Sequence, residues 1–149
     1  MGASPPQGVE AWCQIQLASG QWLRHGPALE WHNNGRVAVE SSYHNGTIHG
    51  PFHAWYPDGT SSTEGQYNQG EKTGLWRSFY ADGTHSEQGH YVEGLKQGLW
   101  IQRAATGDRT EAWYVADQRD GVWQSYDAFD VPLKQRIYRE GRMVSQQEL

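Results

Sequence analysis

Glycine recurs along this chain with a period of 24 residues, in three columns that keep the same phase. The first column contains Gly26, Gly50, Gly74, Gly98 and Gly121, at spacings of 24, 24, 24 and 23 residues. The second contains Gly35, Gly59, Gly83 and Gly107 and is completed by Asp130, while the third contains Gly46, Gly70, Gly94, Asp117 and Gly141. A fixed period of this length is the signature of a repeat array, in which each unit packs mainly against its neighbours.

Aromatic residues fill three more columns of the same repeat. The first contains Phe52, Trp76, Trp100 and Trp123, and the second contains Trp31, Trp55, Phe79 and Tyr126, with Arg103 in the fourth repeat. The third contains Tyr43, Tyr67, Tyr91, Tyr114 and Tyr138, once a one-residue deletion before Tyr114 is allowed for. Because hydrophobic residues make up only 36% of the chain, these large rings must supply the packing that aliphatic side chains usually supply.

The second and third glycine columns mark chain reversals. Asn34-Gly35, Asp58-Gly59 and Asp82-Gly83 predict type I′ hairpin turns, in which both central residues have positive φ. Asn45-Gly46 and Gln69-Gly70 mark the opposite turns, so that reversals alternate about 11 and 13 residues apart. The sequence therefore predicts an all-β fold, an antiparallel β-hairpin repeat array of about ten strands, built as an elongated twisted meander or a shallow solenoid.

The repeats divide the chain into four parts. Residues 1–10 read as a flexible N-terminal linker, and residues 11–25 as a degenerate first repeat that contains Trp12, Gly20 and Trp22. Residues 26–144 form five 24-residue repeats, and residues 145–149 form a C-terminal tail. The fourth repeat is the most degenerate.

Both faces of the predicted ribbon carry aromatic rings, because side chains alternate across a strand. Trp76 lies on one face of its strand, and Leu75, Arg77 and Phe79 lie on the other. We expect the column of Trp76 to form the core together with the tyrosines. The column of Trp31, Trp55, Phe79 and Tyr126 is either a second core, if the ribbon coils into a solenoid, or an exposed ladder that binds a partner.

Composition excludes several classes of partner. The chain has 12 basic and 17 acidic residues, a net charge of −5, and no basic run, which argues against nucleic acid and against anionic lipid. Cys13 is the single cysteine, so no internal disulfide can form. Residues 1–8 lack the features of a secretory signal. We expect a cytoplasmic protein if the chain is full length, and a periplasmic or cell-envelope protein if an upstream signal has been removed.

Candidate chemistry is sparse. Glu40, Glu64 and Glu111 share one repeat column, and a flat sheet offers carboxylates no cleft in which to act as an acid–base pair. We interpret them instead as candidate partner-binding residues that meet basic groups. The seven histidines appear to share no column and show no spacing typical of a metal site, and no catalytic or nucleotide-binding motif is present. We therefore expect no cofactor, no metal and no enzymatic activity.

The repeat resembles MORN-type repeats, in particular the variant found in bacterial YwqK-type antitoxin proteins. The resemblance rests on two stretches of sequence, Gly50-Pro-Phe-His-Ala-Trp-Tyr-Pro-Asp-Gly and Gly74-Leu-Trp-Arg-Ser-Phe-Tyr-Ala-Asp-Gly, and on the segments that follow them. It implies an elongated antiparallel sheet that works as a scaffold for contacts with proteins or membranes. The fourth and fifth repeats depart from the pattern, at Arg103-Ala-Ala-Thr and Asp127-Ala-Phe-Asp-Val-Pro.

Three functions follow as hypotheses. The first is a protein-binding scaffold, an antitoxin or immunity-type protein that neutralises a toxin, which could be basic. The second is a cell-envelope or carbohydrate-binding array that uses the aromatic ladder, and the third is a scaffold that associates with membrane lipid. The sequence leaves the oligomeric state open.

Overall fold

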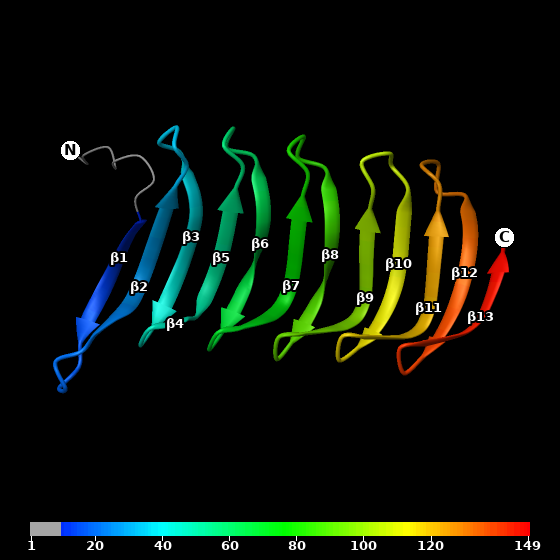
Figure 1. Cartoon of the computed structure of the whole chain (residues 1–149). Helices are drawn as coiled ribbons and strands as arrows, with labels where there is room; N and C mark the ends of the chain where they lie inside the picture. Colours follow the sequence, from blue (N-terminus) through cyan, green and yellow to red (C-terminus); the bar gives the residue numbers. More distant parts are fainter. Residues whose placement is uncertain (1–9) are drawn as a thin grey trace.

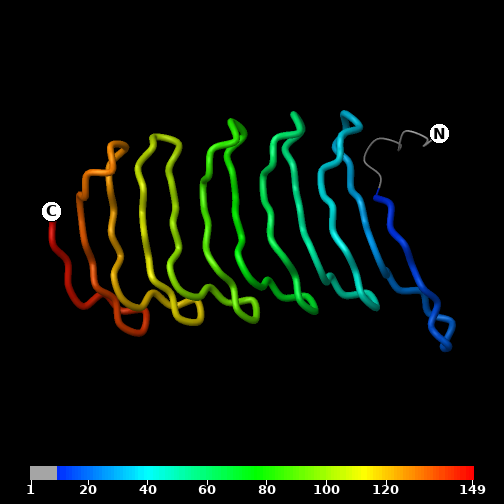
Figure 2. Tube along the Cα trace, turned by 180° about the vertical axis from the view of Figure 1, so that it is seen from behind, coloured from blue at the N-terminus to red at the C-terminus, as the bar shows by residue number. Residues whose placement is uncertain are grey.

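The computed structural model describes residues 10–149, which form one antiparallel sheet of thirteen strands (Figures 1 and 2). No helix in this part of the chain is long and apolar enough to cross a membrane. The strands are β1 (Glu10–Gln16), β2 (Trp22–Trp31), β3 (Val37–His44), β4 (Thr47–Ile48), β5 (Gly50–Trp55), β6 (Ser61–Asn68), β7 (Glu71–Phe79), β8 (His85–Val92), β9 (Leu95–Arg103), β10 (Arg109–Val115), β11 (Gln118–Tyr126), β12 (Pro132–Arg139) and β13 (Arg142–Glu148).

The sheet is an open meander. Strands follow one another across it in sequence order, except that the two-residue β4 pairs with β3 beside β5. Counted as one strand, β4 and β5 complete the ten strands of the five predicted repeats, and β1 and β13 extend the sheet at its two ends (Figure 1). The all-β hairpin-array prediction is thus confirmed, as the meander and not the solenoid.

The predicted segment boundaries fall inside strands. The limit at residue 25 lies within β2, and the limit at residue 144 lies within β13, so residues 145–148 continue the last strand. The linker assigned to residues 1–10 lies outside the described residues except for Glu10, which begins β1.

The turns show one correction. Gly35, Gly59 and Gly83 have positive φ, but Asn34, Asp58 and Asp82 do not, so these are not type I′ turns. At the second of them, Tyr56 N–H donates to Thr60 O and Gly59 N–H to Tyr56 O, which closes a three-residue loop with only the glycine left-handed.

The physical reason lies in the loop residues. Pro57 has a negative φ fixed by its ring, and Asp58 Oδ1 accepts the Thr60 N–H at 2.8 Å, so the first two loop residues form a type I turn. Positive φ at two successive residues occurs instead at the opposite turns, Asn45-Gly46, Gln69-Gly70, Glu93-Gly94, Ala116-Asp117 and Glu140-Gly141.

One face of the sheet, here called the core face, carries a row in which large and small residues alternate. Gly65 is paired with Phe52, and Gly89 with Trp76. A Cβ atom on Gly65 would lie 2.3 Å from the Trp76 ring, and one on Gly89 would lie 2.2 Å from the Trp100 ring. These glycines are thus required for space, because each Trp lies directly over the backbone of the preceding strand.

The core-face tryptophans are the most buried large side chains of the described chain. Trp76 is 4% exposed and Trp100 is 3% exposed. Tyr67 and Tyr91 meet the Trp76 ring edge-on at centroid distances of 5.0 and 6.1 Å, and Lys72 Nζ lies 4.2 Å from the same ring. A single-layer sheet thereby obtains a core without a second layer.

Hydrogen bonds between successive repeats hold both rows of turns. At one edge, Tyr56 Oη donates to Phe79 O and Tyr80 Oη to Arg103 O, both at 2.7 Å. At the other edge, Gly70 N–H donates to Ile48 O at 2.8 Å. Each turn is therefore fixed by a neighbouring repeat, as expected for an array stabilised by its neighbour contacts.

Candidate functional site

The face opposite the core, here called the ladder face, contains both sets of predicted partner-binding residues. Register places Glu40 beside Leu29, Glu64 beside His53, and Glu111 between Ile101 and Gln124. The aromatic column of Trp31, Trp55, Phe79 and Tyr126 lies two residues further along its strands, and residues two apart share a face. The acidic and aromatic columns are therefore adjacent rows of one surface.

The ladder aromatics are half-buried. The His53 ring lies 4.0 Å from the Trp55 ring, and the His85 ring lies 4.6 Å from the Phe79 ring. These imidazoles cover part of the rings, so each aromatic side chain presents an edge and part of one face to solvent. The ladder is a ridge of partly covered rings.

The first half of the ladder face is hollowed. One shallow depression of about 260 Å³ is lined by Pro27, Glu40, Ser41, Ser42, Pro51 and His53. A second of about 470 Å³ adjoins it, shares Pro51 and His53, and extends to Glu64 and Arg77. Together they form an open trough that crosses β2 to β7 beside Trp31 and Trp55.

The carboxylates of the acidic row differ in availability. Glu40 is exposed and has no ion-pair partner within residues 10–149. Glu64 accepts from Arg77 Nη1 at 2.9 Å, with both side chains more than a third exposed, so that this pair contributes less than about 1 kcal/mol to stability and can exchange partners. The available negative charge is concentrated in the trough.

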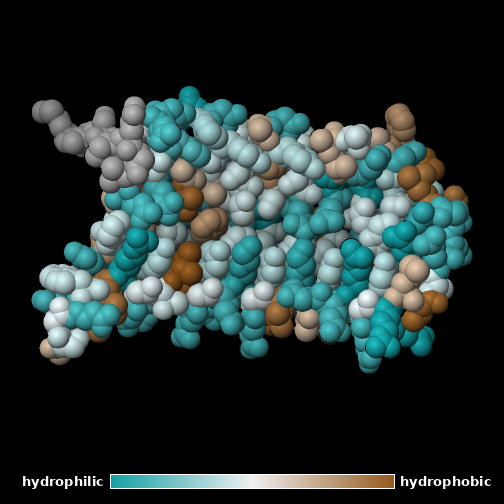
Figure 3. Space-filling model, viewed as in Figure 1, coloured by the Kyte–Doolittle hydropathy of each residue, from teal (hydrophilic) through white to brown (hydrophobic). Residues whose placement is uncertain are grey.

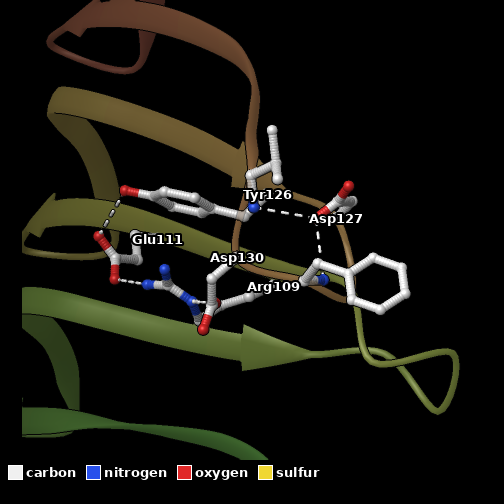
Figure 4. A network of polar contacts seen from close by, with 7 residues as sticks. Arg109, Glu111, Tyr126, Asp127 and Asp130 are labelled. Atoms are coloured by element: carbon white, nitrogen blue, oxygen red, sulfur yellow. Dashed lines mark hydrogen bonds and ion pairs between the residues drawn. The ribbon is translucent and has the colours of Figure 1, made fainter.

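Glu111 and Tyr126 belong instead to an internal network around Arg109 (Figure 4). The Arg109 guanidinium lies 3.8 Å from the Tyr126 ring centroid, bonds Glu111, and donates from Nε to Asp130 at 2.9 Å. Burial disfavours the charged guanidinium, but the hydrogen bond with Asp130 and the charges of Glu111 and Asp130 outweigh it and raise the pKa of Arg109. The structure thus places Glu111 and Tyr126 apart from the trough.

Histidines add one correction. His25 and His49 do share a repeat column, and their Nδ1 atoms accept the N–H groups of Asn45 and Gln69 at 3.3 and 3.2 Å. Each binds the turn that follows it. No group of three or more His, Cys, Asp or Glu side chains that could hold a metal ion occurs between residues 10 and 149.

Sequence reasoning missed several residues of the trough. His53 and Arg77 stand in the same row as the glutamates, and Pro27 and Pro51 form part of the lining. Their own column, 24 residues apart, was a usable signal. It could be placed beside the acidic column only once the hairpin register was known.

The comparisons with known proteins agree with the repeat. Two segments match a MORN repeat variant. They are residues 24–45 and 72–93, under a third of the chain, and they begin two repeat periods apart. No curated protein matches the chain. The MORN-like match covers β2 with β3, and β7 with β8, and so supports a repeat scaffold.

The surface is consistent with a soluble scaffold that lacks a deep site. The face seen in Figure 3 is mostly hydrophilic, with small separate hydrophobic groups. Trp113, on the ladder face, is 50% exposed and pairs with Leu99. It lies in the second half of the array, away from the trough.

Proposed function

We propose that this chain is a non-enzymatic protein-binding scaffold of the antitoxin or immunity type, which neutralises a toxin by covering its surface with the ladder face. The observation that carries the proposal is the trough, where Trp31, Trp55, Glu40 and Glu64 from successive repeats meet on one hollowed surface. Aromatic residues beside available charges are typical of protein-binding surfaces.

The chemistry of the trough favours a protein over a glycan. Sugar rings stack on flat, exposed aromatic faces, whereas His53 already covers part of Trp55 and His85 part of Phe79. The net charge of −5 disfavours an anionic lipid surface and favours a basic protein.

The test is co-expression with the product of the adjacent gene, the usual place of a cognate toxin. We expect the wild-type chain to copurify with that protein and to restore growth of the cells that express it. The double variant Glu40→Gln/Glu64→Gln should weaken the complex at least tenfold, because it removes the trough's charge with almost no change in side-chain shape.

The matched control is Glu30→Gln. Glu30 lies between Leu29 and Trp31 on β2 and therefore on the core face, and it makes the same change of net charge per residue. It should leave binding unchanged. Full neutralisation by the double variant, or no complex with any adjacent-gene product, would contradict the proposal.

A further inference from the structure

We propose that the trough binds a segment in the polyproline II conformation that carries basic residues at every third position and runs across the strands. This inference rests on the proposed function and specifies its ligand. The occupant is a proline-rich, arginine- or lysine-bearing stretch of the partner protein.

The first argument is the period of the ladder. Equivalent residues of successive repeats are two strands apart, which is about 9.5 Å in a sheet whose strands lie ~4.7–4.9 Å apart. A polyproline II helix has three residues per turn and rises about 3.1 Å per residue, so every third side chain recurs after about 9.3 Å on one side. From Trp31 through Trp55 to Phe79, the two periods stay within about 1 Å of each other.

Other conformations match this spacing less well. Alternate side chains on one face of an extended strand recur after roughly 6.6 Å, and an α-helix places residues seven apart about 10.5 Å from each other. Over the two steps from Trp31 to Phe79, the helix would be offset by about 2 Å. The strand would fall out of phase within the first step.

The second argument is the state of the indole N–H groups. On the core face, Trp76 Nε1 donates to Gln66 O and Trp100 Nε1 to His90 O, both at 3.2 Å. On the ladder face, the indole nitrogens of Trp31 and Trp55 have no acceptor within residues 10–149. A polyproline II segment makes no internal hydrogen bonds, so its carbonyl groups need such donors.

The third argument is the charge and lining of the trough. Pro27 and Pro51 form part of an apolar floor without N–H groups, beside which the exposed carboxylate of Glu40 stands. Glu64 stands one repeat further on, paired with Arg77 across an exposed and exchangeable contact. A ligand guanidinium at every third position meets one carboxylate per repeat.

The experiment is calorimetric titration at about 150 mM salt of the full chain with a capped peptide of five Pro-Pro-Arg triplets. Two peptides of equal charge serve as controls. One replaces proline by glycine, which removes the polyproline II preference, and the other places five consecutive arginines before ten prolines, which removes the period. We expect the triplet peptide to bind at least tenfold more tightly than either control.

Variants locate the site. Trp31→Phe/Trp55→Phe keeps the rings and removes the donors, and Glu40→Gln/Glu64→Gln removes the charge. Each should weaken binding of the triplet peptide about fivefold or more. Trp22→Phe, at an indole that is 56% exposed outside the trough, and Glu30→Gln should have no effect.

Equal affinity for all three peptides, or insensitivity to the trough variants, would overturn the inference. If the peptides fail while an adjacent-gene product still binds through Glu40 and Glu64, the polyproline ligand is wrong and the proposed function stands. If the triplet peptide binds as expected but no adjacent-gene product does, the ligand class stands and the antitoxin role is wrong.

Discussion

At the scale of single residues, this fold depends on the absence of a side chain at two glycines. Gly65 and Gly89 are required because the Trp76 and Trp100 rings lie where their Cβ atoms would be. The equivalent positions in the first and fourth repeats hold the small residues Ser41 and Ala112, 5% and 6% exposed. Small residues in this column therefore make the single-layer core possible.

Gly89→Ala is expected to destabilise the chain by about 1–3 kcal/mol or more, because the added methyl group must displace the Trp100 ring. Chemical denaturation monitored by tryptophan fluorescence measures the change. Gln88→Ala, the neighbouring residue on the ladder face, is the control and should cost less than half as much. Equal losses would mean that the Trp100 ring does not need the open space over Gly89.

Alkaline pH provides a second test at this scale. Burial raises the pKa of Tyr91 above its ordinary value of 10.0. The folded state therefore holds this proton more tightly than the unfolded state, so the stabilisation is fully present below pH 10 and is lost as pH rises through the folded pKa. Tyr91→Phe should flatten the fall in free energy of unfolding above pH 10.

Lys72 contributes the opposite slope, because burial lowers its pKa from 10.5 and stability then rises with pH up to that value. The comparison is therefore between wild type and Tyr91→Phe, both of which keep Lys72. Parallel stability curves from pH 9 to pH 12 would show that Tyr91 ionises equally in both states.

At the scale of elements, the two kinds of turn do different work. The three-residue loops at Gly35, Gly59 and Gly83 leave one extra residue in the returning strand, so the pairing shifts between Ala54 and Trp55 in the second repeat. The β9–β10 hairpin pairs without such a shift. The one-residue deletion in the fourth repeat is the loss of this bulge, which explains how Tyr114 keeps its place in the tyrosine column.

The opposite turns require positive φ at a residue that is not glycine. Gln69 has φ of 48° and Asn45, its equivalent, has φ of 51°. Asparagine tolerates this conformation better than glutamine does, so Gln69→Asn should stabilise the chain by about 0.5–1 kcal/mol. Asn45→Gln should shift the thermal midpoint in the opposite direction. A destabilised Gln69→Asn variant would show that the side chain of Gln69 matters more than its backbone.

At the scale of the whole molecule, stability should be uneven. Each strand contacts mainly its neighbours, so an array of this kind can open from its ends. Trp76 and Trp100 are 4% and 3% exposed, while every residue of β13 is exposed.

Amide hydrogen exchange should therefore be slowest in β7 to β10 and fastest in β1 and β13. Mass spectrometry after proteolysis reads each strand separately. Uniform protection along the chain would indicate a single cooperative unit, against the expectation from neighbour-only packing.

The sequence by itself determined the repeat, the hairpin array and the core-face column, because a 24-residue period and strand alternation leave little choice of fold. It could not determine the turn geometry, since Asp-Gly is compatible with two loop lengths and Pro57 with its neighbours decides between them. Nor could it determine which candidates lie in the trough. Tertiary structure joined Glu40 and Glu64 to Trp31 and Trp55, and it enclosed Glu111 and Tyr126 around Arg109, because cross-strand register and the nearest arginine decide which side chains remain available.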